Sequence, residues 1–233
     1  MTRDRLTELL DRNDAHVAAL DRGAFADKRD VQRPPVVSVC CSDSRVSQEG
    51  MWSVDGPGYL FTAGNIGNRV IDVTEDGERV LEGSAAYPLG HTETNVLAVV
   101  GHTGCGAVGA ALHAVETGEY PAEAGVRADV EELVPIVEEG TTDPAVVEGD
   151  ADTTLRNRLV EYNVHEQVSF ATGDPDAAGA DVYGFVYDFH GAYGERDGAA
   201  YLVNANGDRD PDSLRELVGP DRTDHVGTLL AGE

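Results

Sequence analysis

The middle of the chain reads Asn95-Val96-Leu97-Ala98-Val99-Val100-Gly101-His102-Thr103-Gly104-Cys105-Gly106. Its first half is a continuous apolar run, which is typical of a parallel strand buried on both faces. Its second half is rich in glycine and leads into residues 107–116, whose apolar spacing predicts a helix. The junction carries an imidazole and a thiol, His102 and Cys105, with two residues between them. We therefore expect a buried strand that passes directly into a helix and presents two metal-ligating side chains there.

A second apolar run, Val36–Cys41, follows two prolines and predicts another buried strand. Helices and further strands are expected to alternate along the rest of the chain. The expected strands are 59–62, 182–189 and 200–203, the last two as a hairpin, and the expected helices are 75–89, 126–138, 155–170 and 212–218. This order predicts an α/β fold with a mostly parallel central sheet flanked by helices.

A chain of 233 residues can bury one good core, so we expect a single domain over residues 1–233. Residues 1–33 are interpreted as an N-terminal helical arm and a polar linker. The arm carries an apolar stripe with no neighbouring element to cover it, formed by Leu6, Leu9, Leu10, Val17 and Leu20. Residues 139–154 are acidic and have no apolar period, which predicts a loop.

The charge is strongly negative, because 43 acidic residues oppose 17 basic ones and give a formal net charge of −26. Such a surface repels nucleic acids and anionic membranes, so neither is expected as a partner. We interpret it as the solvated acidic shell of a halophilic protein, as from an archaeon with a salt-rich cytoplasm. No apolar stretch approaches the ~20 residues that cross a bilayer, and the N-terminus does not resemble a signal peptide. Three cysteines do not form a disulfide framework, and a cytoplasmic location is expected.

Thermal stability should depend on salt if this interpretation is right. We expect the Tm to rise from low to molar KCl, because screening removes the self-repulsion of a chain that carries −26 charges. Calorimetry over a KCl series checks this, and a matching sucrose series separates screening from general solute exclusion. A Tm that stays constant in KCl would contradict the halophilic interpretation.

The carboxyl ends of neighbouring parallel strands lie at one edge of a sheet, so Cys41 should lie near His102 and Cys105. Two thiolates and one imidazole suit zinc and leave one open coordination position. The alternative is two buried thiols and a core histidine. Adjacent strand residues point to opposite faces, so Cys40 is expected to be a small buried residue rather than a ligand. His113, two turns after Cys105, could touch the site.

Asp43 and Arg45 follow Cys41 in the expected turn. They form either an exposed ion pair that contributes little to stability or a part of the metal site. Beside a metal, Arg45 could keep Asp43 ionised as the acceptor for a metal-bound hydroxide, or Asp43 could be the fourth ligand. Two thiolates neutralise the charge of zinc, so a carboxylate that orients the hydroxide would matter more there.

Residues 104–109 also match the dinucleotide fingerprint G-x-G-x-x-G. That motif expects a second strand ending in an acidic residue about 20 residues on, whereas residues 120–138 predict a turn and a helix. We instead expect these glycines, Gly106 among them, to let the backbone pass close to the metal and a small substrate.

With these residues, the chain resembles the β-class carbonic anhydrases, and among them the plant-like branch. That family has Cys-x-Asp-x-Arg, here Cys41-Ser42-Asp43-Ser44-Arg45, and His-x-x-Cys, here His102-Thr103-Gly104-Cys105. The resemblance extends over residues 30–205. It includes Gln32-Arg33-Pro34, Ala63-Gly64-Asn65, Ala86-Tyr87, Asn163-Val164 and Tyr187-Asp188-Phe189. The chain departs from the family pattern where Phe61, Thr62 and Ala86 replace a basic residue, an asparagine and a glutamate.

The resemblance implies that Cys41, His102 and Cys105 bind zinc and that Asp43 and Arg45 form a catalytic dyad. It implies that Asp43 becomes the fourth ligand in an inactive, closed state. Gln32 would donate to a substrate oxygen, and Tyr87 would line the pocket beside Gly106. The implied lyase reaction is the reversible hydration of carbon dioxide to bicarbonate and a proton by a zinc-bound hydroxide. The family also forms homodimers, or oligomers built from them, in which the N-terminal helix embraces the partner.

Two alternatives keep the same fold and zinc site. In one, the substrate is carbon disulfide or carbonyl sulfide, and released sulfide would identify it. In the other, Asp43 fills the open position permanently and the protein is a zinc-stabilised sensor or binding module. The Asp43–Arg45 pair is evidence against that module, because a purely structural site has no need of it.

Overall fold

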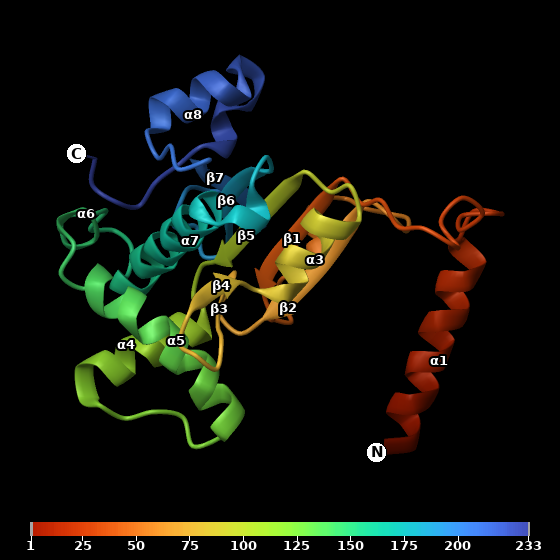
Figure 1. Ribbon diagram of the computed structural model, residues 1–233, viewed down its shortest axis with the longest axis horizontal. Helices are drawn as coiled ribbons and strands as arrows, with labels where there is room; N and C mark the ends of the chain where they lie inside the picture. The colour runs from red at the N-terminus through yellow and green to blue at the C-terminus, as the bar shows by residue number, and fades with distance from the viewer. Residues whose placement is uncertain (1, 233) are drawn as a thin grey trace.

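The computed structural model describes residues 2–232, and the side chains of residues 4–232. Its centre is a five-stranded sheet in the order β2-β1-β5-β6-β7 (Figure 1). The strands are β1 (Val36–Cys41), β2 (Leu60–Asn65), β5 (Val96–His102), β6 (Asp181–Asp188) and β7 (Ala199–Ala205). All neighbouring pairs are parallel except β6 and β7, which are antiparallel. The expected mostly parallel sheet and its terminal hairpin are therefore confirmed.

Helices cover both faces of this sheet. On one face, buried valines of β1 and β5 pack in the main core with α3 (Gly83–His91) and α7 (Leu155–Gly173). Outside α7 lie α4 (Gly106–Thr117) and α5 (Ala124–Gly140), which pack on each other. On the other face, Cys40, Ala98 and Val100 pack with residues near α2 (Gln48–Met51), and α8 (Pro211–Val218) packs beside β7. The apolar runs are continuous because these strands are buried on both sides.

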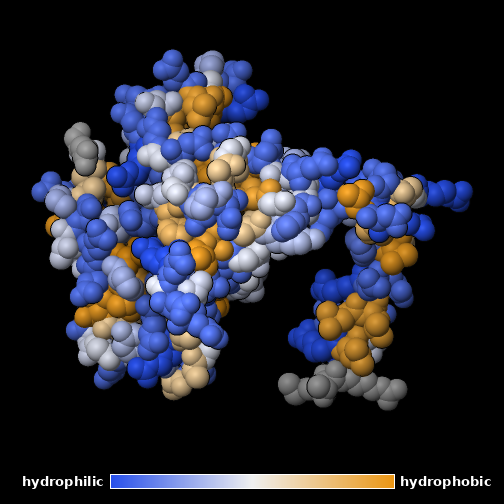
Figure 2. All heavy atoms as spheres, in the orientation of Figure 1, coloured by the Kyte–Doolittle hydropathy of each residue, from blue (hydrophilic) through white to orange (hydrophobic). Residues whose placement is uncertain are grey.

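The N-terminal helix α1 (Thr2–Ala19) stands away from the sheet and its covering helices (Figure 1). Its side chains Leu6, Leu9, Leu10 and Val17 are 58–65% exposed. Figure 2 shows apolar side chains gathered along this helix. The predicted stripe therefore has no partner among the described residues of this chain. None of the helices described combines the length and apolar character needed to cross a membrane.

The helix expected over residues 75–89 is wrong in its first half. Residues 71–81 instead form an antiparallel pair, β3 (Ile71–Val73) and β4 (Arg79–Leu81), around a turn in which the Gly77 N–H donates to the Thr74 carbonyl. Gly77 has φ +81°, which a helix does not tolerate. The helix α3 begins only after Glu82, whose carboxylate accepts the Ser84 N–H as its cap.

The loop expected over residues 139–154 also holds more regular structure than predicted. Helix α5 continues to Gly140, and a short helix, α6 (Pro144–Val147), follows Asp143, whose side chain accepts the Ala145 N–H. Val146 is fully buried, and this burial anchors the segment. Short 3₁₀ segments lie at Pro175–Ala177 and Pro220–His225.

Strand β5 and helix α7 lie close together at Gly101. A Cβ there would lie 2.8 Å from Val164 Cγ2 and 3.0 Å from Val160 Cγ1. We expect Gly101→Ala to lower the free energy of unfolding by about 1–3 kcal/mol, because both valines are buried and cannot move aside freely. Urea denaturation measures this. Gly90→Ala in α3 is the control, since no atom lies within 4 Å of its Cβ position and alanine favours helix. Equal stability of Gly101→Ala and the wild type would contradict the packing.

Candidate metal centre

The candidate ligands meet where β1 and β5 end. Cys41 is the last residue of β1 and His102 the last of β5, and the two strands are parallel neighbours. Cys105 follows in the turn that caps α4. One ligand atom from each of the three lies within 4.8 Å of the other two, and the two sulfurs are 3.7 Å apart. The shared edge expected from a parallel sheet is therefore present.

The ring of His102 is oriented for a metal. Its Nδ1 lies 3.0 Å from the Thr103 carbonyl oxygen, which only accepts hydrogen bonds, so Nδ1 carries the proton. Its Nε2 therefore keeps a free lone pair. That atom is fully buried and has no hydrogen-bond partner among the described residues. A buried polar atom without a partner is rare, and an ion held with the two thiols would satisfy it. The donor set fits zinc.

The backbone amides of Gly67 and Val108 act to lower the pKa of Cys41 and of Cys105, respectively. The hydrogen bond between the sulfurs lowers the pKa of Cys105, aided by nearby His102, and raises that of Cys41. Cys40 lies in the apolar cluster on the other sheet face, where burial raises its pKa to about 12.

Asp43 and Arg45 form a tight pair beside these ligands. The Arg45 Nε and a terminal guanidinium nitrogen donate to the two carboxylate oxygens at 2.9 and 2.7 Å, and the Arg45 backbone N–H adds a third bond of 2.9 Å. These bonds from Arg45 hold the pKa of Asp43 well below its usual range. Asp43 Oδ2 lies 3.6 Å from His102 Nε2. The carboxylate is thus ionised and faces the candidate metal position while it stays bound to Arg45.

The predicted substrate residues are not gathered in one place. Gly106 is the exposed first residue of α4, next to Cys105. Gln32 lies before the start of β1, and β1 itself extends about 16 Å from Val36 to Cys41. It lines a cavity of about 480 Å³ with Phe25 and Pro57. Within one chain, only Gly106 adjoins the metal candidates.

Tyr87 lies on α3 and is 48% exposed. Its ring centroid is 5.3 Å from that of His91 and 6.0 Å from that of Phe61. Phe61 pairs with Val37 near the start of β1, so Tyr87 also lies at the end of the sheet away from Cys41. His113 does not reach the site either, since it is exposed and faces Glu119 at 3.6 Å.

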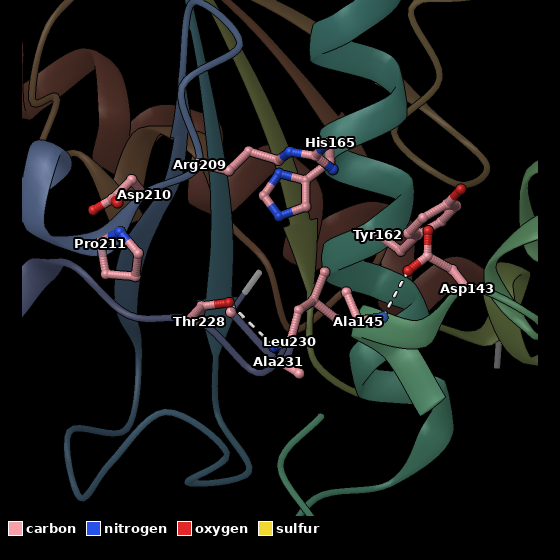
Figure 3. Close-up of a pocket in the computed structure, with 11 residues that line it drawn as sticks. Asp143, Ala145, Tyr162, His165, Arg209, Asp210, Pro211, Thr228, Leu230 and Ala231 are labelled. Carbon is pink, nitrogen blue, oxygen red and sulfur yellow. Dashed lines mark hydrogen bonds between the residues drawn. The ribbon is translucent and has the colours of Figure 1, made fainter. Parts of the chain in front are cut away.

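A cavity of about 300 Å³ lies between α7 and the C-terminal segment (Figure 3). His165, Arg209 and Thr228 are among its lining residues. None of the site residues expected from the sequence lines it. The candidate metal centre is therefore separate from this cavity.

Sequence reasoning missed two contributors to the centre. Phe189, which follows β6, stacks on His102 and lies under Arg45. The Gly67 amide reaches Cys41 from the loop after β2, in a conformation with φ +90°. Phe189 belongs to a recognised motif, but no spacing rule predicts that a residue after β6 packs against both His102 and Arg45. The sequence indicates a glycine-rich loop after β2, but it does not indicate that the loop lies beside Cys41.

The segment around Gly104–Gly109 differs from a dinucleotide site. Helix α4 is followed by α5 and not by the second strand that such a site requires. Gly104 has φ +68°, and a Cβ there would lie 2.6 Å from His190, so this glycine is needed for the turn and for close approach.

Comparison with known proteins identifies the family. A family model described as carbonic anhydrase matches residues 36–192. The chain belongs to the carbonic anhydrase family. Its relatives include the carbonic anhydrase of Mycolicibacterium smegmatis, 36% identical over 106 residues, which are 46% of this chain and 47% of the relative. "Carbonic anhydrase 2" of Mycobacterium tuberculosis is 33% identical over 139 residues, 59% of this chain and 58% of the relative. The matches thus span about half to three-fifths of these relatives.

Solved structures show that the fold is that of the β class. The Coccomyxa β-carbonic anhydrase, solved in complex with acetazolamide, aligns with a TM-score of 0.65 at 21% identity, covering 91% of this chain and 90% of that one. A tetrameric β-carbonic anhydrase from Sordaria macrospora aligns with a TM-score of 0.63 at 18% identity, covering 79% and 92%. At these identities the likeness concerns the fold alone.

Proposed function

We propose that this protein is a zinc carbonic anhydrase that catalyses the reversible hydration of carbon dioxide to bicarbonate and a proton. The observation that carries the proposal is the buried, unpartnered Nε2 of His102 beside two thiols. Cys41, His102 and Cys105 would hold the ion. When bound, zinc would supply a Lewis acid that makes water nucleophilic near neutral pH.

The residues of the chain prepare this chemistry. The Thr103 carbonyl fixes the tautomer of His102, and the Gly67 and Val108 amides stabilise negative charge on the sulfurs. Asp43, kept ionised by Arg45, can only accept hydrogen bonds, so it would orient a nucleophilic water by accepting a hydrogen bond from it. While Asp43 stays bound to Arg45, its carboxylate would not be a ligand of the ion. The Gly106 backbone would lie close to a small substrate.

We also propose that the chain works as a homodimer. The exposed stripe of α1 is the surface that a second copy would cover. Gln32 and Tyr87 keep their proposed substrate roles only if a second chain brings them to a metal centre, because within one chain they lie at the other end of the sheet.

Stopped-flow measurement of carbon dioxide hydration by the zinc-loaded protein in molar KCl tests the proposal. We expect a rate well above that of buffer. A rate equal to buffer would refute it, and sulfide release from carbon disulfide or carbonyl sulfide would then assign the other substrate class. Zinc bound without either activity would favour the sensor or binding module.

A further inference from the structure

We infer that Phe189 is a positioning residue that holds Arg45 in its paired arrangement with Asp43. The inference deepens the proposed function and rests on it for its catalytic meaning. Phe189 follows β6, whereas Cys41, Asp43 and Arg45 lie at the end of β1 and just after it. The Phe189 side chain would therefore couple the two halves of the site, which are the Cys41–Arg45 segment and the His102–Cys105 segment.

The ring of Phe189 touches both halves. The Arg45 guanidinium carbon lies 4.6 Å from the ring centroid, within the range of a cation–π interaction. The imidazole of His102 is stacked on the same ring, with centroids 5.7 Å apart and planes at 19°. One aromatic side chain thus contacts a candidate zinc ligand and the arginine of the dyad.

Buried hydrogen bonds fix the backbone that carries this ring. The Thr103 hydroxyl donates to Asp188 Oδ1 at 3.0 Å and accepts the Phe189 N–H at 3.2 Å. Asp188 is 1% exposed and also accepts the His190 and Tyr193 N–H groups at 2.9 and 2.8 Å. Phe189 therefore has a fixed position next to the residue that follows His102.

Arg45 needs such support. Its side chain is 51% exposed, and within the described part of the chain its hydrogen bonds all go to Asp43. An exposed ion pair alone holds two side chains only weakly. If Arg45 moved away, Asp43 would lose the donors that hold both its oxygens and could turn toward His102 Nε2, from which it is already only 3.6 Å away.

Hydrogen exchange of the Arg45 Nε–H in the metal-free protein tests the inference without reference to activity. Nitrogen-edited NMR follows this proton, which donates to Asp43 Oδ1. In Phe189→Leu it should exchange about three- to tenfold faster than in the wild type, because the cation–π contact is lost. Phe189→Tyr keeps the ring and should exchange as the wild type does. Exchange in Phe189→Leu at the wild-type rate would overturn the inference.

Phe185→Leu is the matched control, since Phe185 lies within β6, just before Phe189 in the chain, but packs against Trp52 with ring centroids 5.1 Å apart. It should leave Arg45 exchange unchanged, and faster exchange there would also overturn the inference, because the effect would then be a general loss of packing. The absorption spectrum of the cobalt-loaded protein adds a second readout. It should change in Phe189→Leu and not in Phe189→Tyr. A protein that binds no cobalt would refute the proposed function, while the exchange rates would still decide the role of Phe189.

Discussion

The His102→Ala variant should bind zinc more than about 100-fold more weakly than the wild type and should lose carbon dioxide hydration. Substitution of a residue that only supports a metal ligand lowers metal affinity or activity by about 10- to 100-fold. The effect should be larger for His102, because it is proposed to bind the metal directly. Its imidazole is fully buried and no other histidine joins the two sulfurs in the group found among the described residues. Competition with a chromophoric chelator measures the affinity, and stopped-flow measures the rate.

His113→Ala is the matched control, because this histidine lies on α4 after Cys105 but is exposed and faces Glu119. It should bind zinc and hydrate carbon dioxide like the wild type. Zinc affinity in His102→Ala equal to that of the control would exclude His102 as a ligand.

The Asp43→Asn variant should keep its zinc and lose about 10- to 100-fold in kcat. An amide would turn one NH₂ group toward the donors of Arg45, which now give three hydrogen bonds to the carboxylate. The paired geometry would break, and no ionised acceptor would face the metal position. Metal analysis and hydration kinetics on the same samples separate the two effects.

Asp212→Asn is the control for this change, because it removes a carboxylate from an exposed arginine pair far along the chain, in α8. It should have wild-type kinetics. If Asp43→Asn kept its full kcat with zinc bound, the Asp43–Arg45 dyad would have no role in catalysis. If it lost zinc, Asp43 would be a ligand in the resting protein.

Much of the sheet was predictable because its strands have local signals. Val36–Cys41 and Val96–His102 are continuous apolar runs, and parallel pairing places their last residues at one edge. The meeting of Cys41, His102 and Cys105 followed from that rule and from the alternation that turns Cys40 away. The wrong helix over residues 75–89 has a local cause as well, since the turn at Gly77 competes with an apolar spacing that is ambiguous over so few residues.

Other features depend on contacts that no local pattern encodes. The place of Phe189 under Arg45 requires the end of β6 to lie beside the end of β5, and that neighbour was not assigned from the sequence. The Gly67 amide acts on Cys41 because β2 pairs with β1 in a register that places Asn65, just before Gly67, beside Cys41. Gln32 and Tyr87 were named from the resemblance alone, and the chain places them away from the metal candidates.

Zinc titration into the metal-free protein, followed by the rate of carbon dioxide hydration, tests the central claim most directly. We predict that the rate rises in proportion to added zinc and reaches its plateau at one zinc per chain, as expected of one site built from Cys41, His102 and Cys105. A hydration rate that stays at the level of buffer when zinc is bound, or that does not respond to zinc, would contradict it.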